Sequence, residues 1–284
     1  MAYVKPDQVV ESMVQAGSTK AQLPIKDLLI RGALAGAFLG FGTTLAFTAE
    51  TQSGMGFIGA MLFPAVFVMV ILLGLELVTG SFALIPLAVL EKKATISQML
   101  SNWFWVIVGH VIGGAFYALL YMIAISQLGH VTDHAVAAKV IAVAEAKTIG
   151  YAALGGDGLI VVFVKAMLCN WMVTLGVVMG MTAKSTLGKM AVMWLPILIF
   201  FAQGFEHAVV NMFVIPAGMM LGADVTMSDW WLWNQIPVLL GNLVSGFLFT
   251  GLALYLTHRS VEAKNVLDLS KQKAPITRAE RGRA

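Results

Sequence analysis

The sequence predicts an all-α membrane protein, and its composition, its apolar runs and the placement of its basic residues each support this fold class. Of the 284 residues, 59% are hydrophobic and only 12% are charged, whereas soluble domains carry about 25% charged residues. This composition excludes an ordinary soluble protein, a disordered chain and a nucleic-acid-binding protein. The single cysteine, Cys169, excludes a disulfide framework and a thiolate metal site.

Six apolar runs are long enough to cross a bilayer, which takes about 20 residues for each helical span. The runs are residues 28–48, 57–90, 103–125, 159–182, 190–221 and 236–256. The second and fifth runs are too long for one simple helix, and polar residues interrupt them at 74–81 and 203–207. We therefore predict six transmembrane helices in which helices 2 and 5 are broken, with each break buried in protein or lining a water-filled cavity.

The two interruptions share a sequence pattern, a Gly-x-Glu followed by an Ile-Pro. Its residues are Gly74, Glu76, Ile85 and Pro86 in the first copy and, 130 positions later, Gly204, Glu206, Ile215 and Pro216 in the second. Glutamate is rare inside apolar spans, so the shared pattern indicates an internal repeat. Because each copy would hold three spans, an odd number, we predict two inverted three-helix repeats, a known transporter design.

A broken helix directs a free, partly positive N-terminus into the membrane. We expect two such ends, one after Ser81 and one near Ala208, and together they favour an anion. His207 is the most informative ionisable residue beside a break, because imidazole titrates near neutral pH and can transfer a proton to a weak-acid anion. His110 is expected to be a packed, hydrogen-bonded residue of the third span.

The basic residues predict the orientation of the chain. With the N-terminus inside, 15 of the 18 lysines and arginines fall on the cytoplasmic side, which the positive-inside rule favours. Both termini are then cytoplasmic. We expect three parts: an N-terminal segment at 1–27, which is either an amphipathic helix at the membrane interface or a short frayed tail, a six-helix transmembrane domain at 28–258 and a basic cytoplasmic tail at 259–284.

Three stretches of the sequence resemble the formate/nitrite transporter family. They are residues 168–173, 204–213 and 236–242, and the second contains a specific Phe-Glu-His-x-x-x-Asn-Met motif. The resemblance extends over essentially all of residues 5–258. It implies an aquaporin-like fold in the plasma (inner) membrane, assembled as a homopentamer with one pore in each protomer, and it implies no enzyme activity, cofactor or metal.

The resemblance also assigns residues to the substrate pathway. It implies that Thr79 and His207 form the selectivity centre and that Glu206 lies beside the histidine. From the residues alone, Glu206 either orients His207 or satisfies the amides of its own break. The asparagines of the family match Asn170 and Asn242, which either hold a loop in shape or contact the permeating ion.

The vestibule and the constrictions follow from the same resemblance. Lys147 matches a lysine of the outer vestibule, within Ala-Glu-Ala-Lys. The outer hydrophobic constriction is implied to consist of Phe63 and Phe200, and the inner one of Phe67 and Leu77. Phe67 stands where the family often has leucine. Apolar constrictions of this kind resist a hydrated ion.

The expected function is a pH-dependent channel or proton-coupled transporter for formate and similar small monovalent anions. His207 would protonate or nearly neutralise the substrate, so protons and the lipid bilayer are the other expected partners. The stretch after Asn211 is most similar to the formate branch, so formate is favoured over nitrite, with lactate and hydrosulfide behind them.

Two other functional classes remain as alternatives. A membrane enzyme would use His110, His207 and Glu206 as metal ligands, although no histidine pair at i, i+4 supports it. A neutral-solute pore is the other, although the paired Asn-Pro-Ala signature is absent from the sequence.

Overall fold

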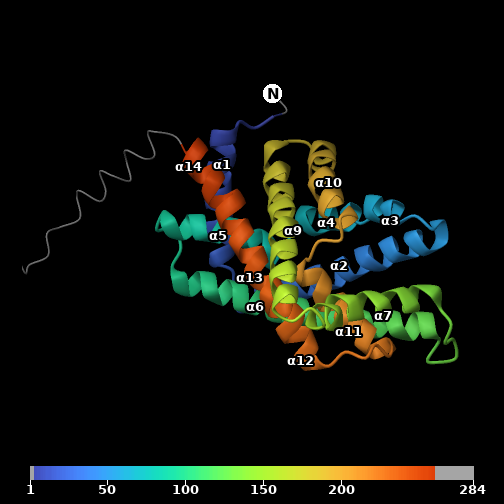
Figure 1. Ribbon diagram of the computed structural model, residues 1–284. Helices are drawn as coiled ribbons and strands as arrows, with labels where there is room; N and C mark the ends of the chain where they lie inside the picture. Colours follow the sequence, from blue (N-terminus) through green and yellow to red (C-terminus); the bar gives the residue numbers. More distant parts are fainter. Residues whose placement is uncertain (1–2, 260–284) are drawn as a thin grey trace, which may run out of the picture.

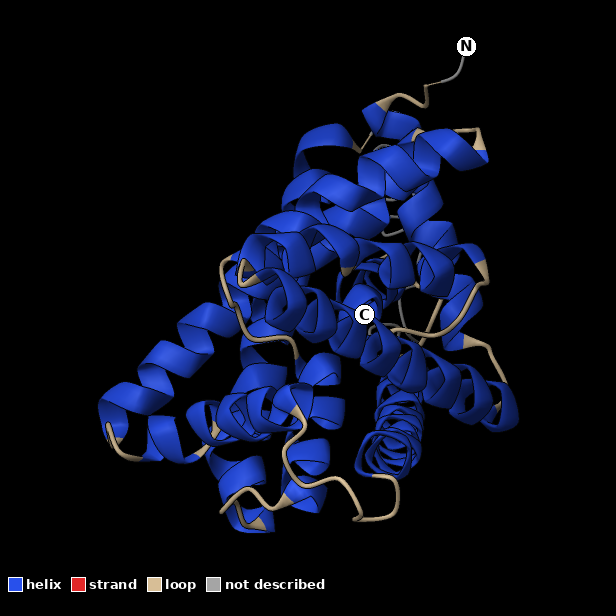
Figure 2. Ribbon diagram, turned by 90° about the vertical axis from the view of Figure 1, so that its right-hand side faces the viewer, coloured by secondary structure: helices blue, strands red, loops and turns tan. Residues whose placement is uncertain are grey.

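The structure, a computed structural model, describes residues 3–259, and every regular element within them is a helix (Figures 1 and 2). A lone bridge pairs Tyr3 with Ala183. The α-helices are α1 (Pro6–Ala21), α2 (Ile25–Ser53), α3 (Gly56–Leu62), α4 (Pro64–Leu72), α5 (Val78–Leu90), α6 (Ile96–Ser126), α7 (Ala135–Lys147), α8 (Ile149–Ala152), α9 (Gly156–Thr182), α10 (Thr186–Ala202), α11 (Ala208–Leu221), α12 (Met227–Trp230), α13 (Ile236–Val244) and α14 (Ala253–His258). Two π-helical segments, η1 (Trp231–Gln235) and η2 (Ser245–Leu252), lie between α12 and α14.

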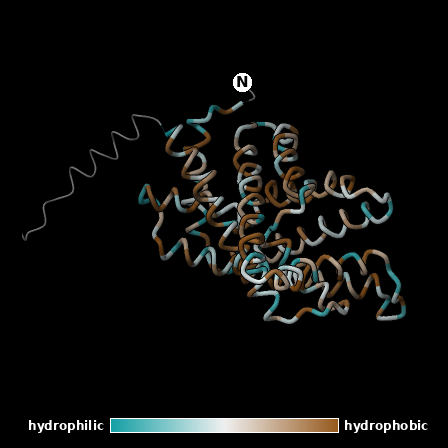
Figure 3. The backbone as a smooth tube through the Cα atoms, in the orientation of Figure 1, coloured by the Kyte–Doolittle hydropathy of each residue, from teal (hydrophilic) through white to brown (hydrophobic). Residues whose placement is uncertain are grey.

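Among the described residues, four helices are long and apolar enough to cross a membrane: α2, α6, α9 and the continuous helix Met227–His258. They coincide with the first, third, fourth and sixth predicted runs. Their chains are largely apolar in Figure 3, and they carry large exposed apolar side chains such as Phe104, Ile160 and Leu240. Such outward apolar surfaces are typical of contact with lipid or with another membrane helix.

The two predicted interruptions are present, and their backbones are alike. The first break (residues 73–77) separates α4 from α5, and the second break (residues 203–207) separates α10 from α11. Gly74 and Gly204 take left-handed φ angles of 64° and 63°, a conformation that glycine adopts without steric penalty. Hydrogen bonds at the same offset also match: Leu75 N donates to Val70 O at 3.0 Å, and Phe205 N to Phe200 O at 3.3 Å.

The helix after the first break begins earlier than the sequence indicated. We expected it to start after Ser81, but α5 begins at Val78, so that expectation is wrong. The reason is tertiary: the Val78 amide donates to His110 Nε2 of α6 at 3.2 Å, and this distant side chain caps the first turn. Thr79 therefore lies inside the first turn of α5 and not in the unwound segment.

The N-terminal helix packs on the protein. Val10, Met13 and Val14 of α1 are fully buried, and a Cβ at Gly17 would collide with the carbonyl of Leu84 in α5. In Figure 1 α1 lies beside α5 and α14. The predicted division at residues 27 and 258 stays a prediction, and nearly all of the basic tail lies outside the described residues.

Candidate functional site

The structure brings together two residues that are far apart in the sequence, Thr79 and His207. Thr79 Oγ1 lies 3.1 Å from His207 Nε2, and both residues are buried. Thr79 is in the first turn of α5, and His207 is the N-cap residue of α11. The two broken helices therefore meet through a hydroxyl and an imidazole.

The hydrogen bonds of His207 define which ring nitrogen carries its proton. The backbone amide of Val210 donates to Nδ1 at 3.2 Å, so Nδ1 is an acceptor. A neutral imidazole has one donor and one acceptor nitrogen, and Nε2 is then the donor to Thr79 Oγ1. The Thr79 hydroxyl keeps its own hydrogen available for another acceptor.

Aromatic side chains enclose one side of this pair. The Phe63 and Phe200 ring centroids lie 5.9 Å apart in an edge-to-face arrangement, and the Phe200 ring lies 5.7 Å from that of His207. Phe67 and Leu77 are also buried, with relative exposures of 1% and 2%. Leu77 directly precedes α5. All four residues implied to form constrictions thus belong to the apolar interior.

Glu206 is a fully partnered carboxylate beside the histidine. Its Oε2 accepts from Lys147 Nζ and Asn211 Nδ2, each at 2.8 Å, and from Asn234 Nδ2 at 3.3 Å. Its Oε1 accepts from the Tyr151 hydroxyl at 2.8 Å. The side chain is 2% exposed, and a buried carboxylate needs such partners. No hydrogen bond joins it to the His207 ring, so its hydrogen bonds fix the second break.

Asn170 and Asn242 tie the helices around the centre to one another. Asn242 Oδ1 accepts from the first amide of α11, that of Ala208, at 3.0 Å, and its Nδ2 donates to Glu206 O at 3.0 Å. Asn170 Nδ2 donates to Thr79 O at 3.1 Å and to Asn242 O at 2.6 Å. Asn170 Oδ1 is buried without a hydrogen-bond partner among the described residues. The amide groups therefore hold both helix starts in place and leave one acceptor unused.

His110 has a structural task, as expected. Its Nδ1 lies 2.8 Å from the Gly32 carbonyl, to which it donates, while Nε2 accepts from Val78 N. Because both ring nitrogens are occupied, neither is free for a metal ion. No group of three or more His, Cys, Asp or Glu residues that could hold a metal ion occurs among residues 3–259.

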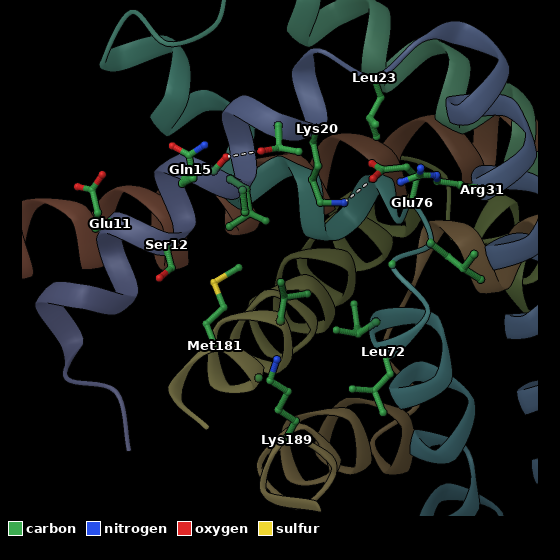
Figure 4. Close-up of a pocket in the computed structure, with 18 residues that line it drawn as sticks. Glu11, Ser12, Gln15, Lys20, Leu23, Arg31, Leu72, Glu76, Met181 and Lys189 are labelled. Atoms are coloured by element: carbon green, nitrogen blue, oxygen red, sulfur yellow. Dashed lines mark hydrogen bonds and ion pairs between the residues drawn. The ribbon is translucent and has the colours of Figure 1, made fainter. Parts of the chain in front are cut away.

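A cavity of about 800 Å³ lies between α1, the first break and the end of α9, and we call it the α1 vestibule (Figure 4). Lys20 of α1 points to Glu76 of the break, with Nζ 2.8 Å from Oε1. The Glu76 side chain is 3% exposed, and its Oε2 has no hydrogen-bond partner among the described residues. Arg31, Lys189 and Glu11 also line this cavity, so three cationic and two anionic side chains face it.

A second cavity of about 280 Å³ reaches the His207 side chain from between α2 and α7, and we call it the α7 vestibule. Lys147 lines it, together with Lys139, Glu50 and Phe200. The two vestibules lie near opposite ends of α9. Met181, close to the end of α9, lines the first. In contrast, α8, which follows Lys147, packs against the start of α9, where Gly158 lies against the Tyr151 carbonyl.

Several residues of the site were missed by the sequence analysis. Tyr151, Asn211 and Asn234 bind Glu206, and Lys20 binds Glu76. Asn211 belongs to the specific motif and could have been found there. Asn234 lies in the π-helical segment η1, and no periodicity in the sequence indicates which side chain such a segment presents.

These features define a class: a multi-pass helical membrane protein with buried polar residues at its centre and a cavity on each of two sides. A sequence model described as formate/nitrite transporter matches residues 7–256. The chain belongs to the formate/nitrite transporter family, a family of channels and transporters.

Similar proteins with names and solved structures agree with this membership. A probable formate transporter of Methanothermobacter thermautotrophicus is 32% identical, over 90% of this chain and 98% of that protein. A solved ion channel of the same family superposes with a TM-score of 0.74 and 26% identity, covering 88% of this chain and 98% of the other. A pentameric formate channel with formate bound has the same fold, with a TM-score of 0.67 and 24% identity over 82% of this chain and 96% of the other.

Proposed function

We propose that this protein is a pH-dependent channel or proton-coupled transporter for formate and similar small monovalent anions. Family membership, the name of the 32% identical relative and the fold shared with a formate channel support this substrate class. The hydrogen bond between Thr79 and His207, where two broken helices meet, carries the mechanism. The pore runs through each protomer, and five protomers assemble as in the similar structure described as pentameric.

The proposed membrane architecture has six crossings arranged as two inverted three-helix repeats. Each pair of short apolar helices, residues 56–72 with 78–90 and residues 186–202 with 208–221, forms one broken crossing. The caps support the repeat: Val78 N donates to His110, and 130 positions later Ala208 N donates to Asn242. Both termini lie in the cytoplasm, the α1 vestibule opens to that side, and the membrane is the plasma (inner) membrane.

The proposed path of the substrate follows the charges and then the apolar rings. An anion is attracted by the lysines of a vestibule and reaches Phe63 and Phe200, which remove its water. Loss of water disfavours the charged form of a carboxylate and raises its proton affinity. Formate therefore takes a proton from hydronium in the vestibule, giving formic acid and water, and crosses the centre as the neutral acid.

His207 and Thr79 act in this proposal as hydrogen-bond donors to the substrate. Because Nδ1 accepts the Val210 amide, the ring holds one proton, on Nε2, and giving it away would leave an imidazolate in an apolar site. Nε2 and the Thr79 hydroxyl therefore hold the acid by donating hydrogen bonds to it, and formal proton transfer from the ring is disfavoured. Asn170 Oδ1, buried and unpartnered, is an acceptor for the acid proton.

Substitution of His207 tests this mechanism. His207→Asn keeps a capping oxygen for the Val210 amide and removes the Nε2 proton, whereas His207→Ala removes both. We expect each variant to assemble and to lose the pH-dependent part of formate uptake into proteoliposomes by at least about tenfold, an expectation of order 1.4 kcal/mol or more. Unchanged pH-dependent uptake in both variants would defeat the mechanism.

Nitrite remains the second candidate substrate, with lactate and hydrosulfide after it. All are small monovalent anions of weak acids, and the same centre could neutralise each of them. Competition of nitrite, lactate and hydrosulfide against labelled formate, measured at several pH values on one purified preparation, ranks the substrates. Glycerol or water flux faster than formate flux would instead favour the neutral-solute pore.

A further inference from the structure

The α7 vestibule carries a second lysine that the central site does not use. Three charged side chains line this cavity: Glu50 from α2 and Lys139 and Lys147 from α7. Lys139, Val143 and Lys147 all line it, and their spacing of four residues places them on one face of the helix. The two lysines are therefore successive cationic positions along one wall of the vestibule.

The two lysines are held in different ways. Lys147 Nζ lies 2.8 Å from Glu206 Oε2, with side-chain exposures of 16% and 2%, so this pair is part of the buried network. Lys139 Nζ also lies 2.8 Å from a carboxylate, Glu50 Oε1, but these side chains are 36% and 32% exposed. Exposed ion pairs contribute little free energy and open readily. Of the two ion pairs, Lys139–Glu50 is thus the one in which another anion can replace the carboxylate.

We propose that Lys139 is a binding position for the entering anion and that Glu50 is its built-in competitor. This inference rests on the proposed anion transport. A monovalent carboxylate makes the same charge-assisted hydrogen bonds to an ammonium group as a glutamate side chain does. The substrate replaces Glu50 on Lys139, and Glu50 returns when the anion moves inward.

The chemistry of conduction explains why such a competitor is useful. A permeating ion must bind well enough to enter and weakly enough to leave. Because Glu50 is tethered beside Lys139, its effective concentration is high, and it weakens binding without removing the positive charge. Lys139 and Glu50 together would set the substrate concentration at which the α7 side half-saturates, while the rate at the Thr79–His207 centre stays the same.

Opposite charge changes at the two positions test this proposal. The variants are Glu50→Gln, Lys139→Met and the double variant, and Glu145→Gln is the matched control because Glu145 lies on α7 outside the cavity lining. Uptake of labelled formate into proteoliposomes is measured against concentration, at two ionic strengths, for protein oriented with the α7 side outward.

We expect Glu50→Gln to lower KM about two- to fivefold and Lys139→Met to raise it by a similar factor, as expected for one charge in a partly hydrated cavity. The saturating rate should stay within about twofold. The double variant should have a KM between those of Lys139→Met and the unchanged protein, because the ammonium group is absent but no unpaired carboxylate remains. Glu145→Gln should resemble the unchanged protein, and the KM differences should shrink in high salt.

Two results would overturn the inference. A merely structural ion pair would shift KM in the same direction in both single variants, or would lower the saturating rate and the thermal stability instead of changing KM. An equal shift in Glu145→Gln would show a general surface-charge effect. If the unchanged protein takes up no formate, the proposed function fails as well, so the two failures are distinguishable.

Discussion

The two breaks have nearly the same backbone but different chemistry. Each consists of five residues between two short helices, and each turns at a glycine with a φ angle near 64° (Gly74) or 63° (Gly204). Only the second places an imidazole before its helix, since Leu77 occupies the position that corresponds to His207. The comparison teaches that the break is a scaffold and that the chemistry depends on the side chains placed on it.

The glutamates of the two breaks, Glu76 and Glu206, differ in the number of side chains that bind them. Glu206 has four side-chain partners, whereas Glu76 has one, Lys20, and an oxygen without a partner among the described residues. Lys20 is 23% exposed and Lys147 16%. The second break is therefore the more rigidly held of the two, as expected for the side that positions the histidine.

The largest expected effect on stability comes from replacing the carboxylates of the two breaks, Glu206 and Glu76, one at a time. Glu206→Gln leaves the partly buried Lys147 without its counter-charge and places the new amide NH2 group among other hydrogen-bond donors, so we expect a loss of about 3–5 kcal/mol. Glu76→Gln should cost about 1–2 kcal/mol, because Lys20 is more exposed. Thermal unfolding in detergent, followed by tryptophan fluorescence, measures the difference. Equal losses, or the reverse ranking, would break the proposed contrast between the breaks.

A smaller effect should be equal on both sides. Gly74→Ala and Gly204→Ala each force a Cβ into a left-handed conformation, which costs about 1–2 kcal/mol, and neither Cβ meets another atom within 4 Å. Gly156→Ala is the control, because its Cβ also meets nothing and its φ angle is not positive. If the losses in free energy of unfolding of the two break variants differ by more than about 1 kcal/mol, the two breaks share a backbone shape but not the same energetic cost.

The smallest effect concerns how α1 is attached beside the first break. Hydrogen bonding to Arg259, opposed by some desolvation and reinforced by Lys93, lowers the pKa of Glu11. Because the pKa is lower in the folded protein than in the unfolded chain, this stabilisation is present above about pH 4.3 and is lost as pH falls through the folded value.

Acid should therefore loosen α1. Hydrogen exchange of the α1 amides, compared between about pH 6 and pH 3.5 after correction for intrinsic rates, measures this loosening. Glu11→Gln should remove the pH dependence, and Asp7→Asn is the control, because Asp7 also lies on α1. A pH dependence that persists in Glu11→Gln would assign it to another group.

Much of the fold could be predicted from the sequence, for local reasons. The long apolar runs predicted α2, α6, α9 and the last long helix, and the Gly-x-Glu pattern predicted both breaks. The predicted start of α5 was wrong, because the side chain that caps this helix, His110, comes from a helix elsewhere in the chain. The interruption at Phe63–Pro64 between α3 and α4 was not predicted either.

The site could be predicted less completely. Thr79 and His207 were assigned through the family resemblance, and the structure places them 3.1 Å apart. Whether they pass a proton or only donate hydrogen bonds depends on Nδ1 of His207, and its acceptor role follows from the amide of Val210. The roles of the proposed pathway residues stay predictions until the variants are measured.

The sequence alone determined where the chain is apolar, where it is interrupted and that glycine stands at each interruption. These properties depend on neighbouring residues, because hydrophobic length and backbone freedom are local quantities. Only the tertiary structure decided which lysine meets which glutamate, that Asn234 joins the partners of Glu206, and that Lys139 lies beside Glu50. Such pairings join residues up to 89 positions apart, and they are set by how the helices pack against one another, which no local pattern encodes.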